Sequence, residues 1–231
     1  MSILYEERLS DSPFVETITH GRTQSDGSTL RPSESRWHLV FVRQPGLVQP
    51  LVVGPVTTAG VVSWREGAEI LWIELKLGTF LPHPPARNLL DREIMLPQAA
   101  SQSFWLDGSA WQFPDYDNAD TFVDRLVRHG VLVRDADVAA ALRDQLQDVP
   151  SRTMWHRFRR ATGLTQSHIR QAERARQAAA LLQQGVSILD TVDMAGYFDQ
   201  PHLTRSLKHW IGFTPAQIVS MQKPACMHKP E

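Results

Sequence analysis

The stretch AGYFDQPHLTRSLKHWIGFTP, residues 195–215, decides the fold of the C-terminal half. A glycine, Gly196, interrupts one helical pattern, and a second begins shortly afterwards at Asp199, a residue type favoured at the N-cap of a helix. Leu203 and Leu207 are four residues apart and would anchor the second helix against the first. Two helices joined by so short a glycine turn predict a helix-turn-helix.

The outer face of the second predicted helix is polar. Gln200, His202, Thr204 and Arg205 point away from the leucine anchors. Glutamine and arginine can pair with base edges in a major groove, and threonine and histidine can reach bases or phosphates. Taken alone, these residues fit equally well the solvated face of an ordinary amphipathic helix. A metal site at His202 is disfavoured, because no second ligand lies at ligand spacing on the same helix.

Charge is divided unevenly along the 231 residues. Residues 1–120 hold 9 basic and 15 acidic side chains, whereas residues 121–231 hold 15 and 10. This asymmetry favours a polyanionic partner for the second half, although a basic cluster can also be a solvated face. The single cysteine, Cys226, excludes an internal disulfide and a cysteine-based zinc site. No signal peptide or membrane-length apolar run is present, so we expect a cytoplasmic protein without a membrane partner.

The chain changes its periodicity near its middle. Short β-branched and aromatic runs at 36–42, 47–54, 57–64 and 70–78 predict strands of a small barrel or sandwich. From Thr121 onward the apolar spacing is helical throughout, which predicts an all-helical second half. Five tryptophans of the first half fit either a ligand pocket or an ordinary β-barrel core: Trp37, Trp64, Trp72, Trp105 and Trp111.

The helix-turn-helix stretch resembles the signature of the AraC/XylS family of bacterial transcription regulators. The matching residues are Ala195-Gly196-Tyr197, Leu203-Thr204-Arg205, Lys208 and Gly212-Phe213-Thr214-Pro215. Upstream, SRTMWHRFRRATGLT (151–165) is similar to the family's first recognition helix, and QSHIRQAERARQAAALLQQG (166–185) to its linker helix. The likeness covers about residues 121–221. Two departures concern the first helix-turn-helix, where Pro150 replaces a capping serine and segment 143–150 lacks the usual turn glycine.

The resemblance implies an α+β multidomain chain. A β-rich, cupin-like barrel at 1–118 would bind an effector or dimerise, and residues 119–222 would form an all-α domain with two helix-turn-helix units joined by a long linker helix. Residues 223–231 would be a flexible tail. Carried over by position, the base-reading residues are Arg152, Trp155, His156, Gln200, Pro201, His202, Thr204 and Arg205, and the phosphate-binding residues are Arg157, Arg159, Arg160 and Lys208. Trp155 also fits a buried core position.

The expected function is therefore sequence-specific binding of double-stranded DNA for transcription regulation, without enzymatic activity, cofactor or metal. A rigid linker helix would place the two recognition helices about one turn of DNA, roughly 34 Å, apart. The resemblance also implies a small-molecule effector, whose pocket the sequence does not locate, and allows a homodimer and contact with RNA polymerase. The alternative is a cupin-type ligand-binding protein or enzyme whose helical half mediates protein contacts.

Overall fold

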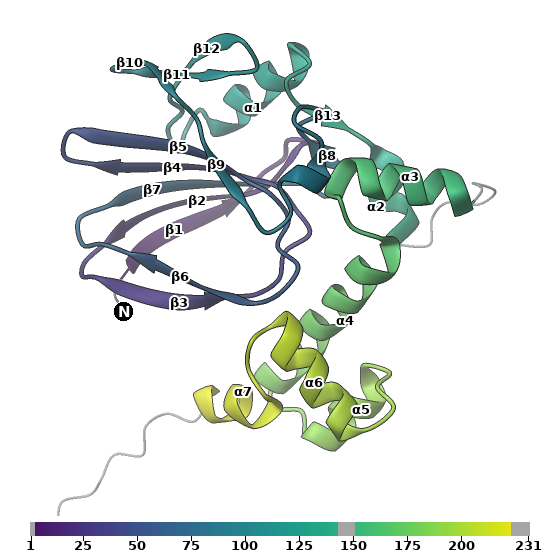
Figure 1. Ribbon diagram of the computed structural model, residues 1–231. Helices are drawn as coiled ribbons and strands as arrows, with labels where there is room; N and C mark the ends of the chain where they lie inside the picture. Colours follow the sequence, from purple (N-terminus) through teal and green to yellow (C-terminus); the bar gives the residue numbers. More distant parts are fainter. Residues whose placement is uncertain (1–2, 143–150, 223–231) are drawn as a thin grey trace, which may run out of the picture. The chain divides into compact units, whose positions relative to one another are not determined.

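A computed structural model describes residues 3–142 and 151–222 of the chain (Figure 1). Its contacts divide the chain into two compact units. Unit 1 comprises Met1–Thr29, Ser35–Val56 and Val62–Gln166, and unit 2 comprises Leu30–Glu34, Thr57–Val61 and Ser167–Glu231. The domain boundary expected between residues 118 and 119 stays a prediction. Among the described residues, no helix is long and apolar enough to cross a membrane.

The main sheet of unit 1 has six strands in the order β1-β2-β7-β4-β5-β9, with antiparallel neighbours. Its strands are β1 (Ile3–Leu9), β2 (Val15–Thr23), β4 (His38–Gln44), β5 (Leu47–Val53), β7 (Glu69–Leu75) and β9 (Glu93–Met95). A three-stranded sheet follows, made of β10 (Gln98–Ala100), β11 (Ser103–Leu106) and β12 (Ser109–Gln112). Two further strand pairs are β8 (Thr79–Phe80) with β13 (Val133–Arg134), and β3 (Gly27–Arg31) with β6 (Gly60–Trp64).

The β-rich first half is confirmed, because the four predicted runs overlap β4, β5, β6 and β7. The sheets do not close on one another into a barrel within residues 3–142 and 151–222, and the six-stranded sheet ends at β1 and β9. A cupin-like barrel is therefore not established. The tryptophans of the first half differ in exposure: Trp37 and Trp111 are buried, whereas Trp105 is 46% exposed.

Aromatic side chains from three elements share the core of unit 1. Phe41 of β4 lies 5.5 Å from Phe104 of β11 and 5.9 Å from Phe122 of α1 (Ala119–Arg128), measured between ring centroids. Phe104 is fully buried, and its ring also stacks on Phe113 at 5.3 Å. Tilted and edge-on rings at these distances add to the stabilisation that their apolar burial provides. Helix α1 is thus packed into the β-rich core.

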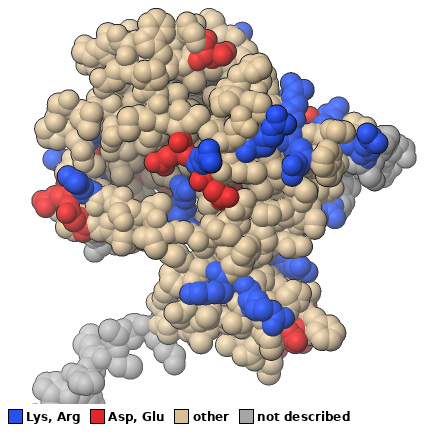
Figure 2. All heavy atoms as spheres, in the orientation of Figure 1, with Lys and Arg blue, Asp and Glu red and all other residues tan. Residues whose placement is uncertain are grey.

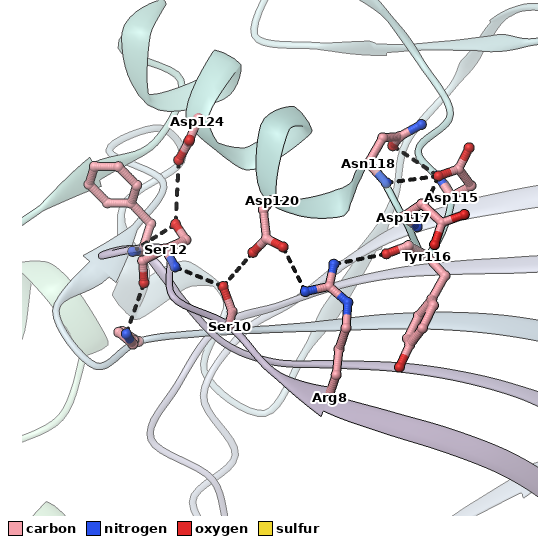
Figure 3. Close-up of polar contacts among 11 residues, drawn as sticks. Arg8, Ser10, Ser12, Asp115, Tyr116, Asp117, Asn118, Asp120 and Asp124 are labelled. Carbon is pink, nitrogen blue, oxygen red and sulfur yellow. Dashed lines mark hydrogen bonds and ion pairs between the residues drawn. The ribbon is translucent and has the colours of Figure 1, made fainter.

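A polar network also holds α1 to the end of β1 (Figure 3). Arg8 forms an ion pair with Asp120 at 2.8 Å and donates to the carbonyl of Tyr116 at 3.0 Å. Ser10 donates to the other Asp120 oxygen, and Ser12 donates to Asp124 at 3.4 Å. The first strand and the first helix, more than a hundred residues apart, are therefore joined by charge-assisted hydrogen bonds.

The second half is helical with one exception. Its later helices are α2 (Ala136–Leu142), α3 (Ser151–Thr162), α4 (Gln166–Gln183), α5 (Ile188–Met194), α6 (Gln200–Trp210) and α7 (Pro215–Gln222). The expectation of helix alone fails at β13, where Val133 pairs with Phe80 of β8. The amide of Asp135 then donates to the carbonyl of Gly78 at 2.7 Å, so strand bonding takes up the backbone groups just before α2. The long linker helix is α4, and the segment with Pro150 lies outside the described residues.

The core of unit 2 is formed by α4, α5, α6 and α7. Small side chains of α4, namely Ala172, Ala175, Ala178 and Ala179, let the other helices approach it closely. Leu203 and Leu207 are fully buried in this core, which confirms them as the anchors of α6.

Two segments from the first half of the chain complete unit 2. The amide of Ser33 donates to the carbonyl of Trp210 at 2.7 Å, and the amide of Ala59 donates to the carbonyl of His209 at 3.0 Å. These bonds satisfy carbonyl groups at the C-terminal end of α6, which have no partner within the helix. Arg176 of α4 adds an ion pair with Glu34 at 3.1 Å. Segments 30–34 and 57–61 are therefore part of unit 2 and contact the C-terminal end of α6.

Candidate nucleic-acid interface

The turn between α5 and α6 has the geometry that the sequence predicts. Gly196 has a φ of +68°, a left-handed conformation that glycine adopts without steric cost. The next amide, of Tyr197, donates to the carbonyl of Val192 at 2.9 Å and closes the end of α5. The Asp199 carboxylate accepts a 2.6 Å hydrogen bond from the amide of His202, which confirms Asp199 as the N-cap of α6. We call residues 188–210 the second head.

The outer face of α6 presents the base-reading residues that the sequence predicts. Gln200, Pro201 and Arg205 are exposed, whereas His202 and Thr204 are half-buried. At about 100° per residue, Arg205 lies roughly 160° around the helix from both Leu203 and Leu207. It is thus opposite the buried seam.

The polar side chains of α6 differ in how they are held. The Thr204 hydroxyl donates to the carbonyl of Gln200 at 2.9 Å, and the His202 ring lies edge-on to Tyr197 at 5.1 Å. Lys208 donates to the carbonyl of Gly212 at 3.0 Å. Arg205, in contrast, contacts no polar or aromatic partner in the described part of the chain. It is the base-reading candidate of α6 whose charged group is exposed and unengaged.

Sequence reasoning missed the residues that support the second head from behind. The Tyr197 hydroxyl is 2.9 Å from the Ser206 hydroxyl, which ties the turn to the middle of α6. Arg174 of α4 places its guanidinium 5.0 Å from the centre of the Tyr197 ring and donates to the carbonyl of Gly196 at 3.4 Å. A cation over an aromatic face and a hydrogen bond to the turn both restrain the turn. The motif includes Tyr197, but nothing in its spacing indicates Arg174 as the partner.

Helix α3 is the described part of the first helix-turn-helix, together with α2. We call residues 136–142 and 151–162 the first head. Its inner face is Met154, Phe158 and Ala161, all buried. The carbonyl of Ala161 accepts a 2.7 Å hydrogen bond from the indole of Trp37, so α3 is fixed against the β-rich part of unit 1.

The outer face of α3 has two flanks. One carries Arg152, Trp155 and Arg159, and all three are exposed. Trp155 is 49% exposed, so the core position that the sequence also allowed is wrong. Its ring has the Arg159 guanidinium 5.4 Å from its centre and His156 edge-on at 4.8 Å. Figure 2 shows basic side chains gathered over α3.

The other flank of α3 faces β8 and β13. Arg157 forms ion pairs with Asp135, at 2.8 Å, and with Asp137. The Arg160 guanidinium lies 5.7 Å from the centre of the Phe80 ring. The carboxylates therefore already engage one of the predicted phosphate-binding cations within the protein. The described residues include no cluster of three or more His, Cys, Asp or Glu that could hold a metal ion.

One of three comparisons with known proteins finds a match, and the match lies in this part of the chain. Residues 148–221 match the family model described as a helix-turn-helix domain. Residues 148–221 are an AraC-type helix-turn-helix domain. This domain supports a role in DNA-binding transcription regulation. Comparison of the chain with curated proteins and with solved structures finds no match.

The match begins shortly before α3 and ends in α7, so it covers α3 of the first head and the whole second head but not α2. It includes all the residues predicted to contact DNA, from Arg152 to Lys208. Which of them contact bases and which contact phosphates stays a prediction.

Proposed function

We propose that the protein regulates transcription by placing α6 in a DNA major groove and reading bases with Arg205 and Gln200. The observation that carries this proposal is the Arg205 side chain, which is exposed opposite the buried seam of α6 and is free of intramolecular partners in the described chain. A guanidinium can donate two parallel hydrogen bonds to the O6 and N7 atoms of guanine. Gln200 lies in the first turn of the same helix, which is the part that contacts base edges in this motif.

The remaining predicted contacts have different roles in this proposal. On α3, the exposed flank of Arg152 and Trp155, with His156 beside it, faces bases, while Arg159 and Arg160 neutralise phosphates. Phosphate contacts supply salt-dependent affinity without regard to sequence, because they release condensed counterions. Base contacts supply the discrimination between sequences.

The β-rich half is proposed to carry a response to a small-molecule effector. The family resemblance supports this role, and the aromatic core shared by β4, β11 and α1 shows that this half has a core of its own. The cupin-like barrel, a homodimer and contact with RNA polymerase stay predictions.

The test of base reading is substitution of Arg205 by alanine, with Lys208→Ala as the matched control. Both remove one exposed cation from α6, so both lower the protein's charge by the same amount. Arg205→Ala should abolish the preference at one base pair and cost about 1–3 kcal/mol on the best site. Lys208→Ala should weaken binding to all sequences equally.

The measurement begins with selection of bound sequences from random DNA by the purified protein, followed by titration of single-base variants of the selected site. An unchanged base preference in Arg205→Ala would remove Arg205 from the base-reading set. Failure to enrich any sequence would reject sequence-specific regulation. Repeating the selection with cell metabolite extract tests the effector: a change in affinity that depends on the extract supports it, and identical binding speaks against it.

A further inference from the structure

A cleft of about 610 Å³ lies within unit 1, between α3 and the β8–β13 strand pair. Its volume is in the range of pockets that bind small organic molecules, roughly 300–1,000 Å³. Thr153, His156, Arg157 and Arg160 line it from α3, and Phe80 and Arg134 line it from the strands. The cleft is built by the flank of α3 opposite to Trp155.

The charged side chains that line this cleft are unevenly paired with one another. Three arginines and two aspartates line it, and both aspartates, Asp135 and Asp137, are bonded to the same guanidinium, that of Arg157. Arg134 and Arg160 have no carboxylate partner within the described residues. Two guanidinium groups are therefore available on the cleft wall, and each has paired N–H donors that match the oxygens of a carboxylate or phosphate.

One of these groups is partly preorganised. The Arg160 guanidinium lies over the Phe80 ring, and Phe80 is only 2% exposed, so the ring beneath is fixed by the core. A guanidinium stacked on a fixed ring loses less freedom when an anion binds it. Val133 and Ala136 add apolar surface beside the two arginines. The cleft thus combines anion donors with an apolar wall.

We propose that this cleft binds a small organic anion, with its carboxylate or phosphate on Arg134 and Arg160 and its apolar body against Val133 and Ala136. The family match assigns no small-molecule ligand to these residues, and only Arg160 among them is a predicted DNA contact. The site differs from the effector position expected within the β-rich half, because α3 of the first head supplies one of its walls.

Such a ligand would act on DNA binding directly. His156 and Arg160 both line the cleft and belong to the predicted DNA contacts. An anion held by Arg160 neutralises a cation that would otherwise face a phosphate, so occupancy of the cleft weakens DNA binding. This consequence rests on the proposed function, whereas binding of the anion does not.

The binding test uses the full chain without DNA, titrated calorimetrically with sodium hexanoate, inorganic phosphate and hexanamide. Hexanoate should bind and uncharged hexanamide should not. Arg134→Gln/Arg160→Gln should weaken hexanoate binding at least tenfold, and Arg134→Gln alone should weaken it severalfold. The control is Arg22→Gln, which removes an exposed arginine from β2 and should change nothing. Phosphate binding without hexanoate binding would assign the site to inorganic or esterified phosphate rather than to a carboxylate.

The proposal is overturned if neither anion binds, or if the double variant binds them as tightly as the unaltered chain. A second measurement adds a DNA fragment selected by the protein. Hexanoate should then lower DNA affinity severalfold in the unaltered chain and leave the affinity of the double variant unchanged. Anion binding with no effect on DNA would retain the site and refute the link to the first head. Absence of any selected DNA would refute the proposed function and leave the anion result intact.

Discussion

Asp135 and Asp137 form ion pairs with Arg157, a residue predicted to contact a DNA phosphate. The Arg157 guanidinium is bonded to both carboxylates, and its side chain is 38% exposed, so solvent and DNA can reach it. Substituting Asp135→Asn/Asp137→Asn removes both negative charges and leaves side chains of nearly the same shape. The freed cation should then bind a phosphate, and overall affinity for DNA should rise.

The size of this gain follows from counterion release. One added phosphate contact steepens the slope of log K against log salt by about 0.9. At 0.1 M salt this corresponds to about eightfold tighter binding, and the loss of affinity between 50 and 200 mM grows by a further factor of about 3.5. Folding stability should fall by less than about 1 kcal/mol, because the three side chains are 20–39% exposed and exposed ion pairs contribute little.

The assay is fluorescence anisotropy of a labelled duplex over a series of salt concentrations. The control is Glu66→Gln/Glu69→Gln, which changes the net charge equally at two exposed positions without freeing a guanidinium. An increase in both variants would mean that net charge alone is responsible. An unchanged slope in Asp135→Asn/Asp137→Asn would refute competition between these carboxylates and DNA phosphates and remove Arg157 from the phosphate-binding set.

Three further predictions concern stability, measured by urea unfolding. Leu203→Ala should cost about 2–5 kcal/mol, because the side chain is fully buried in the core of unit 2; a loss below 1 kcal/mol would contradict that packing. Gly185→Ala should cost about 1–2 kcal/mol, the strain of a left-handed residue with φ +88° and open space around it. Gly212→Ala, at φ +90°, should cost at least about 1 kcal/mol more, because its Cβ would overlap Leu30; equal losses would argue against that contact. Asp120→Asn should cost up to about 1 kcal/mol by weakening the pairing with Arg8, and Asp117→Asn, at a nearby carboxylate with no ion pair to the described residues, should be neutral.

Local chemistry made the second head predictable from the sequence. Gly196, Asp199 and the two leucines of α6 specify a turn, a cap and an anchor through interactions that span a few residues, and all three are observed. The strands β4 to β7 were predictable for the same reason, since each lies in a short local run rich in β-branched and aromatic residues.

Long-range pairing was not predictable in this way. The contacts of α1 with β1, of Val133 with Phe80 and of Arg157 with Asp135 depend on tertiary packing, and a polar or short segment gives no periodic signal of its partner. The strand-forming runs allowed a small barrel or a sandwich, and the cupin-like form of the barrel depended on the family resemblance. The order of the strands along the sheet is not encoded in their individual patterns.

The hydrogen bonds that Ser33 and Ala59 donate to the end of α6 also bear on biosynthesis. A chain made from its N-terminus exposes both amides long before Trp210 leaves the ribosome. Contacts between such distant residues close late and slow folding. A fragment starting at residue 119 lacks both donors from the outset, so it should release its last turn of α6 more readily to hydrogen exchange than the full chain. Studies of DNA recognition that use only the excised C-terminal part would then examine a helix with a frayed end.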